Sequence, residues 1–131
     1  MSDAGVTVRA WGATRAEAFA HAAEAVLALI VPPAAVRTTE TREARAQGQS
    51  PEALLVSWLN ECLYVHEIEG FAVARVVVDT WRDDLMHGVL HGEPLDPARH
   101  RPGRAVKAAT HGGATVRESD GRIEVQAVVV V

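Results

Sequence analysis

The chain has 131 residues, a length typical of one domain, and we predict a single domain over residues 1–131. Its net charge of −4 with neutral histidines excludes a global attraction to nucleic acid or to anionic membranes. The single cysteine, Cys62, excludes an internal disulfide and favours a reducing compartment. No apolar stretch is long enough to span a bilayer, so we expect a cytoplasmic protein without direct membrane contact.

The first predicted elements are a strand and an amphipathic helix. Apolar and polar residues alternate over 6–10, which is typical of a half-buried strand. Thr14 and Glu17 have the spacing of a capping box, and the apolar residues after them recur at helical spacing until Pro32 ends the helix. Segment 36–46 is rich in Thr, Arg and Glu, which favours an exposed edge strand.

A second amphipathic helix is predicted to begin at Ser50, with Pro51 at its first position, and to stop at Gly70. Cys62 lies among apolar residues on the buried face of this helix. We therefore interpret its thiol as an inert core group rather than a nucleophile.

The second half of the chain is dominated by strand patterns. Residues 71–80 form the strongest of these and are predicted to lie at the centre of a sheet. A loop rich in Pro and Gly covers 92–103. The other strand patterns cover residues 85–91, 104–111, 114–118 and 122–131. The predicted fold class is therefore α+β, a two-layer sandwich in which two amphipathic helices pack on one face of a mostly antiparallel sheet.

The histidines do not indicate a His-rich metal site. His87 and His91 share one face of a predicted strand, but at ~3.3 Å per residue they lie about 13 Å apart. That separation is too large for both rings to bind one ion, and no tight His/Cys ligand spacing occurs elsewhere.

The loop at 92–103 carries the most distinctive chemistry of the chain. It places Glu93, Asp96 and His100 around a proline-bounded turn and leads directly to Lys107. Lys107 is the only lysine, whereas every other basic position is arginine. Because a compact, titratable amine differs from a planar guanidinium, we interpret Lys107 as functional. A solvated surface loop is the alternative interpretation.

Evidence for a stand-alone enzyme is weak. The chain has no Gly-x-Ser-x-Gly motif, no P-loop and no dinucleotide-binding fingerprint. We predict a protein that assists a partner instead of catalysing a reaction. A small hydrolase that uses His111 and a carboxylate is the less favoured alternative.

Three stretches, 9–19, 54–64 and 92–110, resemble the archease family, in order and over nearly the whole chain. The resemblance implies an accessory factor that activates a GTP-dependent RNA ligase of the RtcB type in tRNA splicing or RNA repair, by promoting guanylylation of the ligase. RNA contact would then be made only through the ligase. The residues assigned to partner contact on this basis are Lys107, His100, Asp96, Glu93, His111 and Thr110.

The resemblance also implies a divalent cation, Ca²⁺ or Mn²⁺, bound by an aspartate near the N-terminus, a penultimate aspartate and the terminal carboxylate. This chain departs from that pattern, since Gly5 and Val130 stand at the two aspartate positions. Asp3 shares the strand face of Gly5 and is the candidate substitute, together with the carboxylate of Val131. A hard cation needs several oxygen ligands, so we predict weak or absent binding. The alternative function is a metal-free binding or chaperone-like module that keeps the fold without activating a ligase.

Overall fold

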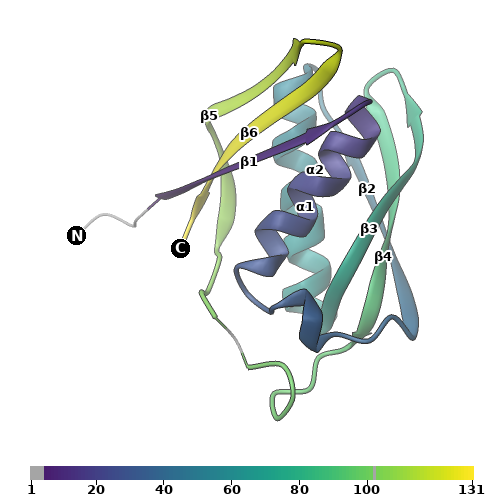
Figure 1. Cartoon of the computed structure of the whole chain (residues 1–131), viewed down its shortest axis with the longest axis vertical. Coiled ribbons are helices and arrows are strands. Elements are labelled where there is room, and N and C mark those ends of the chain that lie inside the picture. The colour runs from purple at the N-terminus through teal and green to yellow at the C-terminus, as the bar shows by residue number, and fades with distance from the viewer. Residues whose placement is uncertain (1–4, 102) are drawn as a thin grey trace.

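The computed structural model describes residues 5–101 and 103–131 and is shown in Figure 1. Its two helices lie between two groups of strands. The elements in chain order are β1 (Gly5–Gly12), α1 (Arg15–Ala28), the 3-10 turn η1 (Pro33–Ala35), β2 (Glu40–Gln47), α2 (Pro51–Ile68), β3 (Phe71–Arg82), β4 (Leu85–Pro94), β5 (Ala108–Ser119) and β6 (Arg122–Val130).

Both helices begin where their capping residues predict. The hydroxyl of Thr14 accepts the N–H of Glu17 at 3.1 Å, and the hydroxyl of Ser50 accepts the N–H of Ala53 at 3.1 Å. Gly70 follows α2 with a φ of 63°, the left-handed conformation that ends many helices. Within the described ranges, no helix has the length and apolar character that a membrane crossing requires.

The strands of the described residues form two three-stranded antiparallel sheets, with the orders β1-β6-β5 and β2-β4-β3. Helix α1 packs on β1 and β3, and α2 packs on β5 and β2 (Figure 1). The predicted α+β class, with two helices packed on antiparallel strands, is confirmed. Helix α1 contacts strands of both sheets, and its buried residues span a wide arc of the helix, including Ala18, Phe19 and Ala20.

The prediction that residues 71–80 form a central strand is wrong, because β3 lies at the edge of its sheet and β4 lies at the centre. Part of β3 is covered by helix α1, and not by a further strand of the described residues on that edge. The rings of Phe19 and Trp81 meet edge to face with 4.8 Å between centroids. The carboxylate of Glu24 accepts the N–H of Val76 at 2.9 Å, which satisfies an edge donor that no strand reaches.

Three strand boundaries also differ from the prediction. Strand β4 continues to Pro94, so Glu93 lies in a strand and not in the loop. Strand β5 begins at Ala108, later than predicted, and joins two segments predicted as separate strands through a register shift between Thr110 and Thr115. The predicted strand start at 104–107 is irregular, and the N–H of Arg104 donates to the carbonyl of Leu29, just after α1, instead of to a strand.

The core lies between the helices and the sheets. Trp58, Phe19 and Phe71 are its largest fully buried side chains, and the indole N–H of Trp58 donates to the carbonyl of Phe19 at 2.9 Å. Cys62 is buried on α2, and this burial raises the pKa of its thiol well above the ordinary value. The interpretation of Cys62 as a core residue is confirmed.

Candidate functional site

The start of β5 pairs with the last residues of β6, which pair on their other edge with the first described residues of β1. The N–H of Lys107 donates to the carbonyl of Val130 at 2.7 Å. Val130 also pairs with Gly5 in β1 and with Ala108 in β5. The Lys107 side chain is exposed. The structure therefore places the only lysine of the chain beside the point where the first and last strands meet.

Asn60 of α2 fixes the position of this strand start. Its side-chain N–H donates to the carbonyl of Ala109 at 3.2 Å, and its side-chain oxygen accepts the N–H of Ala109 at 2.8 Å. The amide takes the place that a neighbouring strand would occupy, because β5 lies at the edge of its sheet. Ala109 is two residues from Lys107, so the backbone around the lysine is held by β6 on one side and by α2 on the other.

A shallow hollow of about 350 Å³ lies where α2 meets the start of β5. Its lining includes Asn60, Tyr64, Glu67, Ile68 and Lys107. Apolar side chains, one carboxylate and one amine thus border a single depression. A surface of this composition suits contact with another macromolecule more than conversion of a small substrate.

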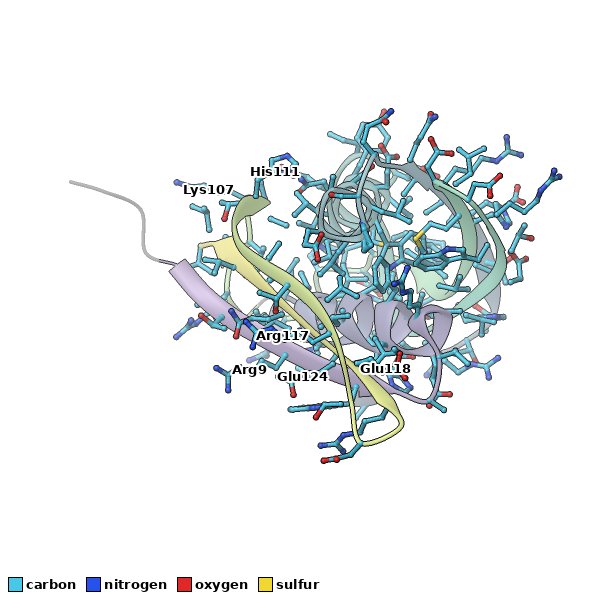
Figure 2. The ribbon with its side chains drawn as sticks, turned by 90° about the horizontal axis from the view of Figure 1, so that it is seen from above. Arg9, Lys107, His111, Arg117, Glu118 and Glu124 are labelled. Carbon is cyan, nitrogen blue, oxygen red and sulfur yellow. The ribbon has the colours of Figure 1, made fainter. Side chains whose placement is uncertain are left out.

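Thr110 and His111 follow Lys107 along the same strand. The hydroxyl of Thr110 lies 3.2 Å from the carbonyl oxygen of Val128 and 3.3 Å from that of Gly112, so this hydroxyl has hydrogen-bond acceptors within the sheet. His111 is exposed. Figure 2 shows Lys107 and His111 at the same end of the sheet, away from Arg117 and Glu118 near its other end.

Glu93 is the centre of a second group, at the end of β4. Its side chain is buried, and the guanidinium of Arg99 donates to its two oxygens at 2.6 and 3.2 Å. The N–H of Arg37 donates to the same carboxylate at 2.8 Å. These hydrogen bonds, that from Arg99 above all, lower the pKa of Glu93 to about 2. The carboxylate is therefore charged at neutral pH.

His100 is 1 % exposed and joins the two ends of the loop. Its Nδ1 accepts the N–H of Asp96 at 2.8 Å, so the proton of the neutral ring lies on Nε2. Nε2 then donates to Glu93 at 2.9 Å. The carboxylate of Asp96 accepts the N–H of Ala98 at 3.0 Å and lies 3.4 Å from Arg99. The polar side chains of this loop are thus bonded to one another.

The predicted contact residues fall into two groups. The first group, which we call the loop group, consists of Glu93, Asp96 and His100. The second group lies at the start of β5 and consists of Lys107, Thr110 and His111. The segment between them is tied to the end of α1, because the N–H groups of Gly103 and Arg104 donate to the carbonyls of Ile30 and Leu29 at 2.6 and 2.8 Å. The loop group and the bonds to the residues after α1 therefore precede Lys107 along the chain as two separate anchored stretches.

The position that the family pattern assigns to a divalent cation is poor in ligands here. Gly5 and Val130 face each other across the β1–β6 ladder and offer no side-chain oxygen. Among residues 5–101 and 103–131, no three His, Cys, Asp or Glu side chains gather as a metal site would need. Val131 is half-buried beside this position. Asp3, the predicted substitute ligand, lies outside the described residues.

His87 lies in a charged cluster on the outer face of the β2-β4-β3 sheet. Its Nδ1 is 2.6 Å from Asp79, and its Nε2 is 2.9 Å from Glu43. The hydrogen bond with Asp79 is the main cause that raises the pKa of His87, and the same bond lowers the pKa of Asp79. Because each ring nitrogen faces a different carboxylate, the cluster joins three strands and is no chelate.

Sequence reasoning missed Asn60, Tyr64 and Arg99 as parts of these groups. Asn60 carries a signal that could have identified it, a side-chain amide within an otherwise apolar helical stretch. Tyr64 lies just outside the buried stripe of α2 and is exposed. Arg99 has no distinguishing pattern, because its pairing with Glu93 depends on the conformation of the loop.

Comparison with known proteins agrees with this architecture. Residues 2–131 match the Archease protein family (MTH1598/TM1083). Protein archease of Pyrococcus furiosus is 33% identical over 129 residues, which cover 95% of this chain and 91% of that protein. The solution structure of Methanobacterium thermoautotrophicum protein 1598 has a TM-score of 0.79 at 24% identity, covering 100% of this chain and 95% of that one.

A second solved structure, described as an archease and possible chaperone from Thermotoga maritima, has a TM-score of 0.64 at 16% identity. It covers 96% of this chain and 90% of that chain, so the fold is shared over most of both chains. The matched family model spans both groups of candidate residues and the strands that hold them. This chain belongs to the archease family.

Proposed function

We propose that this archease is an accessory factor that activates a GTP-dependent RNA ligase of the RtcB type in tRNA splicing or RNA repair. Archeases are accessory proteins and not enzymes, which supports a role exercised on a partner. The observation that carries the proposal is the placement of Lys107, exposed on a strand start held by β6 and by Asn60. RNA is then contacted by the ligase, and the protein acts in the cytoplasm.

The chemistry of Lys107 fits an action at the ligase active site. An ammonium on a flexible four-carbon stem is a compact point charge that can enter a site too narrow for a guanidinium. The backbone at Lys107 does not need to be ordered on binding, because its N–H already donates to the carbonyl of Val130 and Asn60 already bonds Ala109. The entropy lost on complex formation is reduced accordingly. Glu93 and His100 contribute by shaping the loop that leads to this strand.

Substituting Lys107→Arg tests the proposal. We expect stimulated ligation to fall at least about tenfold although the charge is kept, because the forked guanidinium is larger and has different hydrogen-bond geometry. The measurement is joining of RNA ends by an RtcB-type ligase, with and without the archease. Arg104→Lys, an exchange in the reverse direction in the same segment, is the matched control and should leave stimulation unchanged.

Equal stimulation by the wild type and the Lys107→Arg variant would show that the lysine side chain has no specific role in activating the ligase. Absence of stimulation by the wild type would favour the second candidate, a metal-free binding or chaperone-like module. The specific observation that favours this candidate is the presence of Gly5 and Val130 at two cation-ligand positions.

We further propose that divalent-cation binding by this chain is weak or lost, because the position between β1 and β6 offers few oxygen ligands. Isothermal titration of Ca²⁺ or Mn²⁺ at neutral pH is expected to give no binding in the micromolar range. Micromolar binding that disappeared on Asp3→Ala would contradict this expectation. That result would instead assign a site to Asp3 and the terminal carboxylate of Val131.

A further inference from the structure

The last two turns of α2 expose two large apolar side chains. Tyr64 is 54% exposed and Ile68 is 63% exposed, the highest values for large apolar side chains within the described ranges. The two residues are four positions apart on the helix and therefore lie on the same side. Both border the hollow that Lys107 also borders. Adjacent exposed apolar groups of this kind commonly mark an interaction surface.

This exposure is not a by-product of core packing. Helix α2 already buries a full apolar stripe, which includes Leu55, Trp58 and Leu59. Tyr64 and Ile68 lie outside that stripe, where a polar residue would serve the fold equally well. An exposed tyrosine is also well suited to binding, since it offers a large contact area at a small cost in conformational entropy.

The charges around the two side chains indicate which class of partner fits. Glu67 borders the hollow, and Glu61 lies one turn before Tyr64 on the same helix and is exposed. These two carboxylates disfavour a nucleic acid or an anionic membrane, because both carry dense negative charge. Lys107 supplies a positive group to the lining of the same hollow. Apolar groups bordered by charges of both signs complement a protein surface.

The helix and the strand that border the hollow are joined by hydrogen bonds. Asn60 lies one turn before Tyr64 on α2, and both of its hydrogen bonds reach Ala109 beside Lys107. The helix that carries the apolar side chains and the strand that carries the lysine are thus joined by direct bonds. A surface fixed in advance binds with a smaller loss of conformational entropy.

We propose that Tyr64, Ile68 and Lys107 form one docking surface for the partner protein. The partner presents an apolar side chain between Tyr64 and Ile68, basic groups to Glu61 and Glu67, and an acidic group to Lys107. This inference rests on the proposed function, because the partner in question is the RNA ligase. Tyr64 and Ile68 supply the affinity for the ligase, whereas Lys107 supplies the stimulation of its activity.

The test is a titration of the ligase with archease variants, in which both the half-maximal concentration and the maximal stimulation are measured. The double variant Tyr64→Ala, Ile68→Ala is expected to raise the half-maximal concentration about tenfold or more, with maximal stimulation unchanged. Lys107→Ala is expected to lower the maximum instead. Leu85→Ala, which removes a 50% exposed side chain from the β3–β4 turn, is the matched control and should change neither value.

A third variant distinguishes the classes of partner. Glu67→Lys is expected to raise the half-maximal concentration, because it places a positive charge against the basic groups that the partner presents to this position. Tighter binding by Glu67→Lys would overturn the inference and indicate a polyanionic occupant. Sedimentation of the archease alone adds one more criterion, since a dimer that dissociates on the double substitution would assign the surface to a second copy of the chain.

The failure of this inference can be told apart from failure of the proposed function. If the wild type stimulates the ligase and the double variant gives the same titration curve, the docking surface is refuted and the function stands. If the wild type gives no stimulation, the proposed function fails, and the partner named here fails with it. Thermal unfolding of the double variant should match the wild type, because both side chains lie outside the core.

Discussion

Replacing Trp58 by alanine is expected to lower the free energy of unfolding by about 3–5 kcal/mol. Trp58 is fully buried, so its removal leaves a cavity between α2 and the sheets. It also leaves the carbonyl of Phe19 without the indole donor now 2.9 Å away. Equilibrium unfolding in urea, monitored by far-UV circular dichroism, measures the change.

The matched control for Trp58 is Trp11→Ala. Trp11 is 40% exposed on the outer face of β1, where its ring lies 5.5 Å from the guanidinium carbon of Arg122. Its loss breaks the exposed indole hydrogen bond to Glu124 at 3.0 Å but leaves no cavity in the core, so the expected cost is smaller, about 1–2 kcal/mol. Equal losses for the two variants would show that the core does not depend on Trp58 in the way its burial implies.

Replacing Glu93 by glutamine is expected to disrupt the loop that leads to Lys107 and to change how stability depends on pH. The carboxylate accepts hydrogen bonds from Arg37, Arg99 and His100. A glutamine amide would turn an N–H group toward one of these donors and would leave the charge of Arg99 without its partner. At neutral pH we expect a melting midpoint lower by several degrees and faster proteolysis within residues 95–101.

The sign of the pH effect follows from the lowered pKa of Glu93, which is about 2 in the folded chain against an ordinary value of 4.5. A carboxyl group with a depressed folded-state pKa stabilises the fold above its unfolded pKa, and the contribution falls as the pH drops from about 4.5 toward 2. The difference in stability between wild type and variant should therefore be largest above pH 4.5 and shrink below it. Denaturant titrations between pH 2.5 and 7 measure this difference.

The control for Glu93 is Glu118→Gln, which neutralises an exposed carboxylate on β5. Its effect on the melting midpoint should be small at every pH, because solvent replaces whatever interactions it makes. If the Glu93 variant showed the same pH dependence as the wild type, the network around His100 would not contribute to acid stability. The proteolysis result would then stand alone as a measure of loop order.

The sequence alone determined the features that depend on neighbours within a few residues. Thr14 and Ser50 mark the helix starts because each hydroxyl bonds an N–H only three positions away. Gly70 marks a helix end because the required backbone conformation is a property of that residue alone. The burial of Cys62 followed from helical periodicity, and the order of the helix and strand patterns was sufficient to predict the α+β class.

The tertiary structure decided which of these elements are neighbours and what their polar groups do. Nothing local to residues 71–80 distinguishes burial beneath α1 from burial between two strands, so the order β2-β4-β3 could not be read in advance. Glu93 and Arg37 are 56 positions apart, and Asn60 and Ala109 are 49 apart. Such pairs could not be predicted locally, because each contact depends on how segments far apart in the sequence are placed by the fold. For the same reason, the exposed pair Tyr64 and Ile68 acquires its relation to Lys107 only in the folded protein.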